Sequence, residues 1–533
     1  MKKNGFDYRV LLIFLVLIIL MFGCVMRLYN IGTDGYINTR QYTNTYRIKL
    51  SSIRGSIFDK NLNAITNSSY KLIAVVSPSP LGITAISAEL FEDERLNSVL
   101  ETLKSGKPAV VEVNREIECD AIKCVRVYSD GITEFSCPQL IGYTDSEKHG
   151  ASGIEAAFDE LLYSEETLDA VFATDSLGHI LSGAETEIIG DISLYKSGVA
   201  LTIDNDIQKI THNAMSEVQC GAAVVMEIGS GKIRAMVSRP TFNIEYIDKY
   251  LDAENSPLVN RALLSYNVGS AFKPCVAAAL IENGNHNNYW FNCLGSVTID
   301  GHKFNCHKLS GHGIINLKEA ITQSCNVFFY NASTHLGAQK IYDTVTKFSF
   351  GKSIDLGGIS TAAGSITERD ELEEKNTALA NFSIGQGELL LSPVSILTLY
   401  EAIANDGIYY MPTIIEGTVE KGVLKERKTS APTKAINRDT AKILKEYLVN
   451  VVENGTGTAA KPDNCTAAGK TATAQTGWIK NGEFIQNSWF CGFFPADNPK
   501  YAVAVLVEDE ISNGITGAPI FKKIADGIIQ SSL

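Results

Sequence analysis

The fold is decided by the stretch Ser270-Ala271-Phe272-Lys273, which sets a hydroxyl and an amine three residues apart. The residues that follow are mostly apolar up to Asn283-Gly284, so the motif is predicted to begin a helix. Residues at i and i+3 share one face of a helix, which would bring Lys273 within reach of the Ser270 hydroxyl. The N–H groups at the helix N-terminus would favour a developing oxyanion. This spacing predicts a serine nucleophile with a lysine base beside it.

Two motifs further along the chain could complete such a site. Ser324-Cys325-Asn326 follows an apolar helical stretch, and Lys470-Thr471-Ala472-Thr473-Ala474 is predicted to be a strand. Taken singly, each motif has an ordinary structural explanation: a helix cap for the first serine, a turn for Ser-x-Asn and a solvated strand for Lys-Thr. Their occurrence in this order on one chain favours a single catalytic site.

The segments around the motifs predict an α+β domain. Apolar runs of strand length, bounded by turn residues, occur at both ends of the block that starts near Gly198. Helical stretches, including Ile207–Val218 and Ala518–Ile529, lie beside and between them. The sheet is therefore expected to be assembled from both ends of this block. The predicted strands are Ala222–Glu227, Ile233–Val237, Trp489–Phe494 and Tyr501–Glu508.

The N-terminus is predicted to be a membrane anchor. An apolar run extends over Val10–Met26, and Lys2, Lys3 and Arg9 precede it. The run is at the short end of the length that spans a bilayer, and its basic flank should stay in the cytoplasm. A cleaved signal peptide is the alternative, but no small-x-small cleavage site follows the run. The rest of the chain is expected to face outward.

The length of 533 residues predicts an anchor and two or three folded units. Short alternating strands with Gly and Pro breaks, such as Tyr70–Pro78, follow the anchor. The formal net charge of -13 argues against nucleic acid as a partner, because phosphate binding needs clustered Lys and Arg. We expect a cytoplasmic tail over 1–9, a transmembrane helix over 10–28, an N-terminal domain over 29–192 and a catalytic domain over 193–533.

The 11 cysteines are many for a chain that faces outward, and the odd total leaves at least one unpaired. Cys293 and Cys306 lie near three histidines at spacings that zinc permits, although no close cysteine pair accompanies them. Zinc, a disulfide and free thiols are all open interpretations of this stretch. The predicted active site itself includes no metal ligand and no cofactor. The three histidines are His302, His307 and His312.

Cys325 lies inside the second motif and has two interpretations. Its thiol could pair with Cys293 or Cys306 and switch the site off by oxidation. It could instead be a small buried hydrophobic residue. Activity measured with and without a thiol reductant separates the two.

The chain resembles class B penicillin-binding proteins, and the resemblance covers nearly its whole length. The order S-x-x-K, S-x-N, K-T-x follows the motif set of penicillin-binding proteins and class A β-lactamases. One departure is Ala472, which stands where the family usually has Gly, and its methyl group could narrow the cleft. A smaller one is Val268 in place of the usual Pro before Gly269. Five further stretches are similar to family elements: Arg54–Lys60 to R-G-x-I-x-D-R, Gly153–Glu155 to G-x-E, Asn260–Ala262 to the residues before the nucleophile, Gly385–Gly387 to G-Q-G, and Trp489–Glu508 to the closing strands.

The resemblance implies an architecture and an activity. The architecture is an N-terminal transmembrane helix, an extended and mostly-β pedestal of the dimerisation type, and a penicillin-binding/β-lactamase-like transpeptidase domain with an antiparallel sheet flanked by helices. The activity is peptidoglycan D,D-transpeptidation through a serine acyl-enzyme, with covalent inhibition by β-lactams. The implied process is septal wall synthesis or sporulation, and the implied partners are a membrane-embedded glycosyltransferase and division or sporulation proteins. The catalytic domain would lie outside the cell membrane.

The same resemblance assigns catalytic roles. Ser270 would attack the penultimate D-Ala carbonyl of a peptidoglycan stem peptide, and Lys273 would be the base. Ser324 would relay the proton to the leaving amine. Asn326 would hold Lys273 and the substrate backbone.

The third motif is assigned to substrate binding and electrostatics. Lys470 would supply positive potential, and Thr471 and Thr473 would bind the terminal carboxylate of the substrate. Ala472 lies in the same substrate-binding strand. The oxyanion hole would be formed by the backbone N–H groups of Ser270 and Thr473.

Two other classes of protein compete with this interpretation. A β-lactam sensor should have several membrane spans, and a β-lactamase would not need a large N-terminal domain. A catalytically weak, penicillin-binding scaffold of a division or sporulation complex is favoured only by Ala472. Labelling with fluorescent penicillin would separate an enzyme from a scaffold.

Overall fold

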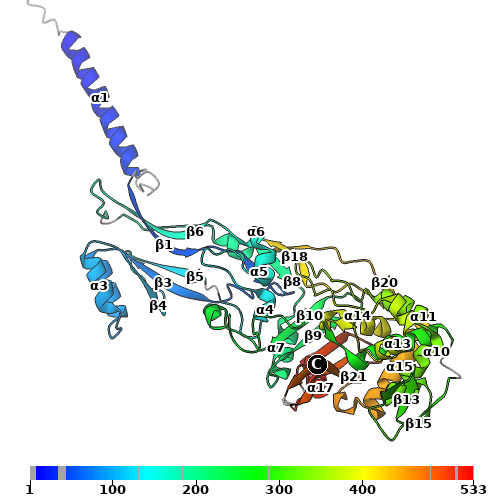
Figure 1. The fold of residues 1–533 in the computed structure, drawn as a ribbon. Helices are drawn as coiled ribbons and strands as arrows, with labels where there is room; N and C mark the ends of the chain where they lie inside the picture. Colours follow the sequence, from blue (N-terminus) through cyan, green and yellow to red (C-terminus); the bar gives the residue numbers. More distant parts are fainter. Residues whose placement is uncertain are drawn as a thin grey trace, which may run out of the picture. The chain divides into compact units, whose positions relative to one another are not determined.

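The computed structural model describes residues 8–33, 44–128, 131–181, 184–284, 289–480, 482–509 and 514–531. The chain forms two compact units, each built from segments that are separated in the sequence (Figure 1). The units interleave along the chain, and the predicted contiguous domain bounds stay a prediction. Unit 1 comprises Met1–Ile53, Tyr70–Tyr128 and Glu165–Asp191, and unit 2 comprises Arg54–Ser69, Ser129–Ser164 and Ile192–Leu533.

The first helix, α1 (Tyr8–Thr33), includes the predicted anchor at 10–28. Its large apolar side chains between Leu12 and Met26 are exposed. Among the helices whose residues the structure describes, none is both long and apolar enough to cross a membrane. The helix is confirmed, and the membrane anchor stays a prediction.

Unit 1 contains two three-stranded antiparallel sheets, with the orders β1-β6-β7 and β4-β3-β5. The strand predicted at Tyr70–Pro78 is confirmed as β3. Helices α2 (Pro80–Glu89) and α3 (Leu96–Lys104) share a buried apolar cluster with the second sheet, in which Ala74 of β3 lies. The strands are β1 (Thr45–Ser52), β3 (Tyr70–Val76), β4 (Ala109–Val113), β5 (Ile122–Tyr128), β6 (Thr167–Ala173) and β7 (Glu187–Ile189).

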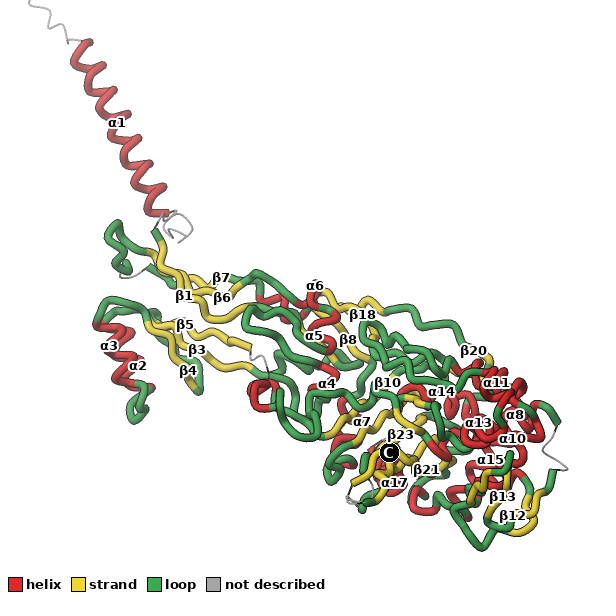
Figure 2. The backbone as a smooth tube through the Cα atoms, in the orientation of Figure 1, coloured by secondary structure: helices red, strands yellow, loops and turns green. Residues whose placement is uncertain are grey.

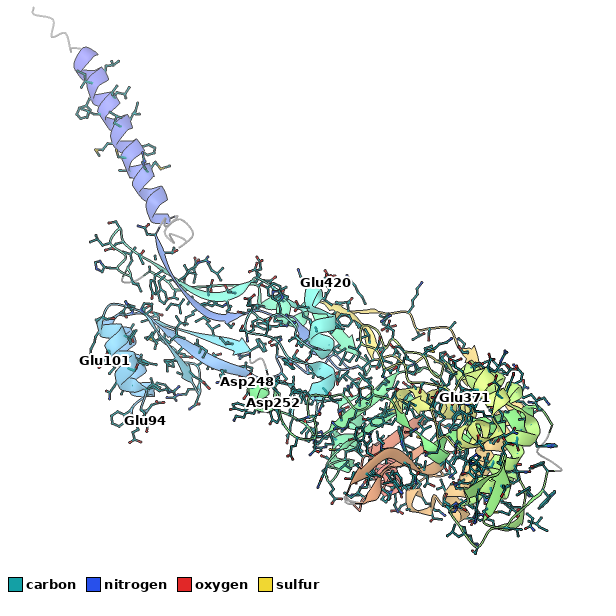
Figure 3. All side chains as sticks on the ribbon, viewed as in Figure 1. Glu94, Glu101, Asp248, Asp252, Glu371 and Glu420 are labelled. Atoms are coloured by element: carbon teal, nitrogen blue, oxygen red, sulfur yellow. The ribbon has the colours of Figure 1, made fainter. Side chains whose placement is uncertain are left out.

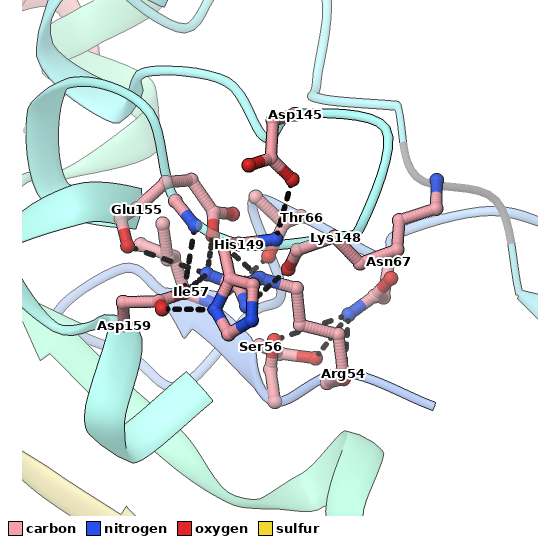
Figure 4. A network of polar contacts seen from close by, with 12 residues as sticks. Arg54, Ser56, Ile57, Thr66, Asn67, Asp145, Lys148, His149, Glu155 and Asp159 are labelled. Carbon is pink, nitrogen blue, oxygen red and sulfur yellow. Dashed lines mark hydrogen bonds and ion pairs between the residues drawn. The ribbon is translucent and has the colours of Figure 1, made fainter. Parts of the chain in front are cut away.

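An ion-pair network in unit 2 is centred on Arg54 (Figure 4). The Arg54 guanidinium donates to Glu155 Oε2 at 2.8 Å and to Asp159 Oδ1 at 2.9 Å. It also donates to the carbonyl oxygen of Lys148 at 2.8 Å, and His149 Nδ1 lies 2.7 Å from the second Asp159 oxygen. The Arg54 and Glu155 side chains are each 8% exposed, so the network is a buried one. It joins two of the stretches that resemble family elements, 54–60 and 153–155.

A four-stranded sheet in unit 2 has the order β19-β18-β8-β2. Its strand β2 runs parallel to β8, and the other pairs are antiparallel. The strands are β2 (Ser56–Phe58), β8 (Gly198–Leu201), β18 (Ile415–Glu420) and β19 (Val423–Glu426), and the short helices near them are α4 (Pro138–Ile141), α5 (Gly153–Ala157) and α6 (Asp159–Leu162).

The main sheet of unit 2 is antiparallel and five-stranded, with the order β10-β9-β23-β22-β21. Strands from the two ends of the block pair at its centre, where Ala223 of β9 is opposite Val505 of β23. This confirms the α+β prediction and the expected assembly from both ends. The strands are β9 (Gly221–Glu227), β10 (Ile233–Arg239), β21 (Ala468–Lys480), β22 (Glu483–Phe494) and β23 (Tyr501–Val507).

Helices cover both faces of this sheet, which explains why β9 is apolar at successive positions. Ala223 and Val225 pack into one buried cluster with α7 (Asn205–Ala214) and α17 (Gly517–Ser531). Their neighbours Ala222 and Val224 point to the opposite face, because successive strand side chains alternate, and join the cluster formed by the remaining helices. The predicted helix Ile207–Val218 ends earlier, at Ala214.

The remaining helices gather on the side of unit 2 that carries α8, α10 and α15 (Figure 2). They include α8 (Lys273–Glu282), α9 (Leu317–Thr322), α10 (Asn326–Leu336), α11 (Ala338–Val345), α12 (Arg369–Glu374), α13 (Asn376–Ser383), α14 (Pro393–Ala404) and α15 (Arg438–Asn454). Short paired strands complete the unit: β11 (Tyr266–Asn267) with β16 (Leu390–Leu391), β12 (Phe291–Cys293) with β15 (Gly313–Ile315), β13 (Ser296–Ile299) with β14 (His302–Asn305), and β17 (Ile408–Tyr409) with β20 (Thr433–Lys434).

The surface carries many of the carboxylates that give the chain its negative charge. Glu94, Glu101 and Glu420 are exposed and project from the ribbon (Figure 3). A surface of this kind offers little to a polyanion.

Candidate active site

A cleft of about 390 Å³ in unit 2 brings together residues of all three predicted motifs. Two of the eight predicted residues, Lys273 and Lys470, are fully buried beside it rather than in its lining. The other six line the cleft: Ser270, Ser324, Asn326, Thr471, Ala472 and Thr473. Side chains that are far apart in the sequence therefore converge on one surface.

Ser270 lies in a short 3-10 helix, η4 (Gly269–Phe272), and α8 begins only at Lys273. The predicted α-helix therefore starts later than the serine. The Gly269 N–H donates to the carbonyl oxygen of Gly385 at 2.9 Å, and the Tyr400 hydroxyl donates to the carbonyl oxygen of Ala271 at 2.9 Å. These contacts hold the turn that carries the nucleophile.

Two glycines make this close approach possible. Gly385 has φ +75°, and a Cβ added to it would lie 2.0 Å from the carbonyl oxygen of Gly269. Gly269 has φ +51°, and a Cβ there would lie 3.1 Å from the carbonyl oxygen of Thr473. The second contact also shows that the nucleophile turn packs directly against strand β21.

The Lys273 amine is held by the Ser-Cys-Asn loop. Its Nζ donates to the Ser324 carbonyl oxygen at 2.7 Å, to Ser324 Oγ at 3.2 Å and to Asn326 Oδ1 at 2.7 Å. It also lies 5.4 Å from the centroid of the Phe329 ring. Burial lowers the pKa of Lys273 to about 7, against smaller opposing effects of the nearby thiols. A substantial fraction of this lysine is therefore neutral at physiological pH.

This arrangement differs in one respect from the sequence prediction. In the part of the chain that the structure describes, Lys273 Nζ makes no hydrogen bond to Ser270 Oγ. The 3-10 turn changes the angular relation between the two residues from that of an α-helix. Catalytic hydrogen bonds often tighten only when substrate is bound, so the base and the nucleophile can still meet.

Ser324 has an unusual backbone conformation, with φ +55°. Non-glycine residues seldom adopt it, and such positions are enriched at functional sites. Here it accompanies a carbonyl oxygen that accepts from Lys273. The next residue, Cys325, caps α10 through a Phe328 N–H···Sγ contact of 3.4 Å, so Asn326 is the first residue of that helix.

Strand β21 forms the opposite wall of the cleft. Lys470 is fully buried and donates to the carbonyl oxygen of Thr471 at 2.9 Å. Burial, with the Lys273 cation as a second cause, lowers the pKa of Lys470 well below its usual value. Thr473 is exposed to the cleft, and Ala472 is 5% exposed and pairs with Trp489 of β22.

Comparisons with known proteins agree with this geometry. The family described as "Penicillin binding protein transpeptidase domain" matches residues 221–526, which is more than half of the chain. The chain belongs to the class B penicillin-binding proteins. It is 27% identical over 519 residues to stage V sporulation protein D of Bacillus subtilis, covering 90% of this chain and 78% of that protein.

Other penicillin-binding proteins and transpeptidases are similar to this chain over a smaller share of its length. Identity is 27% with the peptidoglycan D,D-transpeptidase MrdA of Acinetobacter baumannii and 29% with PbpB of Mycobacterium tuberculosis. The matches cover 72% and 73% of this chain, and 61% and 60% of those proteins. The fold is also that of penicillin-binding protein 3 of M. tuberculosis in complex with aztreonam, with a TM-score of 0.66, 23% identity, and coverage of 92% and 97% of the two chains.

The cleft of this class B penicillin-binding protein contains residues that the sequence reasoning did not assign to it. Thr456 Oγ1 lies 2.9 Å from Thr471 Oγ1, and His307 is exposed in the lining. Tyr400 and Phe329 support the catalytic turn and the lysine from behind. The sequence signals for these four are weak, because none belongs to a motif and each is brought in by tertiary packing.

A thiol and imidazole cluster adjoins the cleft of the penicillin-binding domain. Ligand atoms of Cys293, Cys306, His312 and Cys325 all lie within 4.8 Å of one another, so this set could hold a metal ion. Cys293, Cys306 and Cys325 form no disulfide in the structure. Of the three histidines named from the sequence, His302, which is exposed on β14, and His307 are not in the set.

Proposed function

We propose that this chain is a peptidoglycan D,D-transpeptidase that cross-links stem peptides through a Ser270 acyl-enzyme. The observation that carries the proposal is the buried Lys273, which is held by the second motif and has its pKa lowered to about 7, beside a cleft that exposes Ser270. A neutral amine in that place can take the proton of an attacking hydroxyl. The relation to the A. baumannii peptidoglycan D,D-transpeptidase MrdA supports the same activity.

In the acylation step, Ser270 Oγ bonds to the penultimate D-Ala carbonyl carbon, and its proton passes to the neutral Lys273 Nζ. The tetrahedral intermediate then breaks the carbon–nitrogen bond to the terminal D-Ala. The leaving amine takes a proton from Lys273, relayed by Ser324 Oγ, which lies 3.2 Å from Nζ. The backbone N–H groups of Ser270 and Thr473 would stabilise the oxyanion.

In the second step, an amine of a neighbouring stem peptide attacks the acyl carbon. The bond to Ser270 Oγ breaks, the amine proton passes to Lys273, and the serine is reprotonated. Thr471 and Thr473 would bind the terminal carboxylate of the donor peptide. Lys470 would add positive potential behind them, to the extent that it is protonated.

The location of the protein in the cell and the biological process in which it acts are inferred from the N-terminal helix and from the relatives. The apolar run over Val10–Met26, which lies in α1, and the basic residues before it support a single-pass anchor with the N-terminus in the cytoplasm and the catalytic unit outside. The relation to a sporulation protein over 90% of this chain supports a role in sporulation, with septal wall synthesis as the alternative. A membrane-embedded glycosyltransferase and other division or sporulation proteins would be its partners, and β-lactams its covalent inhibitors.

A catalytically weak scaffold is the second candidate, and Ala472 is the observation that favours it. Its methyl group lies on the strand that the substrate must approach. The β-lactam sensor interpretation has no comparable support in the described residues.

The test is covalent labelling of the full chain with fluorescent penicillin, followed by peptide mapping. We expect an adduct on the peptide that carries Ser270, and its loss in Ser270→Ala. Ser265→Ala is the matched control, because Ser265 lies five residues earlier and its buried hydroxyl makes no hydrogen bond within the described residues. Release of D-Ala from a stem pentapeptide then separates an enzyme from a scaffold. An adduct that survives Ser270→Ala would refute the assignment, and an adduct without D-Ala release would favour the scaffold.

A further inference from the structure

The four residues of the thiol and imidazole cluster come from different elements that meet beside the active site. Cys293 ends β12, Cys306 follows β14, His312 precedes β15, and Cys325 caps α10. The two small sheets, β12 with β15 and β13 with β14, lie together with α10 in Figures 1 and 2, and α10 contacts β12, β13 and β14. The three cysteines are buried and His312 is partly buried, so the cluster is closed on most sides.

Three distances between the ligand atoms match those of a tetrahedral zinc site. With Zn–S bonds of about 2.3 Å and Zn–N bonds of about 2.1 Å, tetrahedral angles give S···S edges of about 3.8 Å and S···N edges of about 3.6 Å. The Sγ atoms of Cys306 and Cys325 are 3.8 Å apart. His312 Nδ1 is 3.6 Å from the Sγ atoms of both Cys293 and Cys306. Three of the six edges therefore match the geometry of one coordination sphere.

A disulfide does not account for the same distances. A disulfide bond is about 2.05 Å long and would leave an odd thiol and the imidazole without a role. The 3.8 Å separation of Cys306 and Cys325 is instead a packing or ligand distance. Three sulfurs and one imidazole nitrogen, all within 4.8 Å of one another, form a donor set typical of structural zinc.

The surrounding backbone is organised as it is in structural zinc sites, where the ligand atoms accept further hydrogen bonds. The Phe328 N–H approaches Cys325 Sγ at 3.4 Å, and the Cys306 N–H donates to the carbonyl oxygen of Gly295 at 2.8 Å. The His312 N–H donates to the carbonyl oxygen of Cys293 at 3.0 Å. Ligand positions are thus fixed by main-chain contacts from both the small sheets and the helix.

The segment that supplies three of the ligands has little else to stabilise it. It consists of two separate two-stranded sheets, and two-stranded sheets are marginal on their own. Several of its large apolar side chains face solvent, among them Leu294, Leu309 and Ile314. A bound metal contributes folding free energy directly, which is how small loop-rich segments are commonly stabilised.

We propose that Cys293, Cys306, His312 and Cys325 bind one structural zinc ion that fixes the Ser324–Asn326 loop of the active site. Cys325 is both a ligand and the middle residue of the second motif. Its neighbours Ser324 and Asn326 hold the Lys273 amine. The metal takes no part in bond making or breaking, and Ser324 and Asn326 are positioned through it.

The first experiment measures the metal on the full chain, purified in detergent under reducing conditions. We expect about one zinc per chain, and after cobalt substitution an absorption spectrum with thiolate-to-cobalt charge-transfer bands and the strong visible bands of a tetrahedral ion. His312→Cys should retain the metal with altered cobalt bands, because a fourth thiolate replaces the imidazole. His312→Ala should bind it more weakly.

Matched controls are Cys465→Ser and His302→Ala, which change the same residue types outside the cluster and should leave stoichiometry and spectrum unchanged. Less than about a tenth of an equivalent of zinc in metal-replete protein would overturn the proposal. So would a disulfide mapped between any two of the three cysteines, or a cobalt spectrum without thiolate bands.

A second measurement tests the link to the active site, and this part alone rests on the proposed function. Removal of zinc by a chelator should slow acylation of Ser270 by fluorescent penicillin about tenfold or more, with recovery when zinc is restored. If zinc binds as expected but acylation does not change, the positioning role is wrong and the metal site stands. If no acylation occurs in either form, the proposed function fails independently of the zinc result.

Discussion

Lys273 Nζ lies 2.7 Å from the carbonyl oxygen of Ser324, a residue whose own backbone is left-handed at φ +55°. The amine is thus oriented by the main chain of a second motif that lies about fifty residues further along the sequence. A carbonyl oxygen can accept from an amine and, more strongly, from an ammonium group, so this contact partly offsets the deprotonation that burial favours. The base can therefore be held in place in both of its protonation states.

The first prediction concerns the pH dependence of acylation. Only neutral Lys273 can accept the Ser270 proton, and its pKa is lowered to about 7 by burial. The second-order rate constant for acylation by penicillin should rise about tenfold per pH unit below pH 7 and level off above it. Stopped-flow fluorescence between pH 5 and 9 measures this profile.

Asn326→Asp provides the internal comparison for that profile. In the wild type, Asn326 Oδ1 lies 2.7 Å from Lys273 Nζ. A carboxylate oxygen in its place should raise the pKa of Lys273 and move the profile to higher pH. A wild-type rate that continues to climb up to pH 9 would show that the base has a pKa well above 7 and would contradict the lowered pKa of Lys273.

The second prediction concerns Gly385. In Gly385→Ala the new Cβ would collide with the carbonyl oxygen of Gly269, 2.0 Å away, and push the nucleophile turn out of place. We expect acylation to slow by about 100-fold. Gly422→Ala is the matched control, since Gly422 has φ +83° but an added Cβ would meet nothing within 4 Å. Equal losses in the two variants would indicate general backbone strain rather than displacement of Ser270.

The third prediction concerns Ala472, the departure from the usual family glycine. Ala472→Gly removes a methyl group from the cleft wall while the pairing of β21 with β22 is retained. Acylation by bulky β-lactams should become faster, because the acyl group gains room beside the strand. Rate constants for a small and a bulky β-lactam, measured on both proteins, test this. An unchanged ratio between the two compounds would mean that the methyl group does not restrict the cleft.

The fourth prediction concerns stability of unit 2. Arg54→Met leaves Glu155 and Asp159 without their cation in a largely buried site, which should cost about 3 to 5 kcal/mol of unfolding free energy. Arg47→Met, which breaks an ion pair with Asp169 whose arginine is 60% exposed, should cost less than about 1 kcal/mol. Chemical denaturation of the two variants gives the comparison, and similar midpoints would contradict the assigned importance of the buried network.

Much of this architecture could be predicted because its signals are local. The apolar run at Ala222–Glu227 needed only its length and turn residues to be recognised as a strand, and it forms β9. The order of the three motifs was sufficient to bring Ser270, Ser324 and Thr471 to one cleft. Local patterns of this kind predict the strands correctly because a strand that is buried on both faces must be apolar along its length.

The details that could not be predicted depend on contacts between distant segments. The 3-10 turn at Ser270 follows from the bond between Gly269 and Gly385, which no local pattern reveals. No local pattern reveals the left-handed backbone of Ser324 either. The four-residue cluster beside the site lacks the close cysteine pair by which zinc sites are usually recognised, because its ligands come from two small two-stranded sheets and a helix cap.

The pairing of β9 with β23 has a consequence for how the molecule is made. One edge of β9 pairs with the nearby β10, but the other edge pairs with 501–507, so the sheet that backs the catalytic groove cannot close until those distant residues have been synthesised. Such long-range pairing is slow, and an incomplete chain would carry Ser270 and Lys273 without a wall to place them against. A truncation that removes the final strand should therefore yield an inactive, aggregation-prone species even though every motif residue is still present.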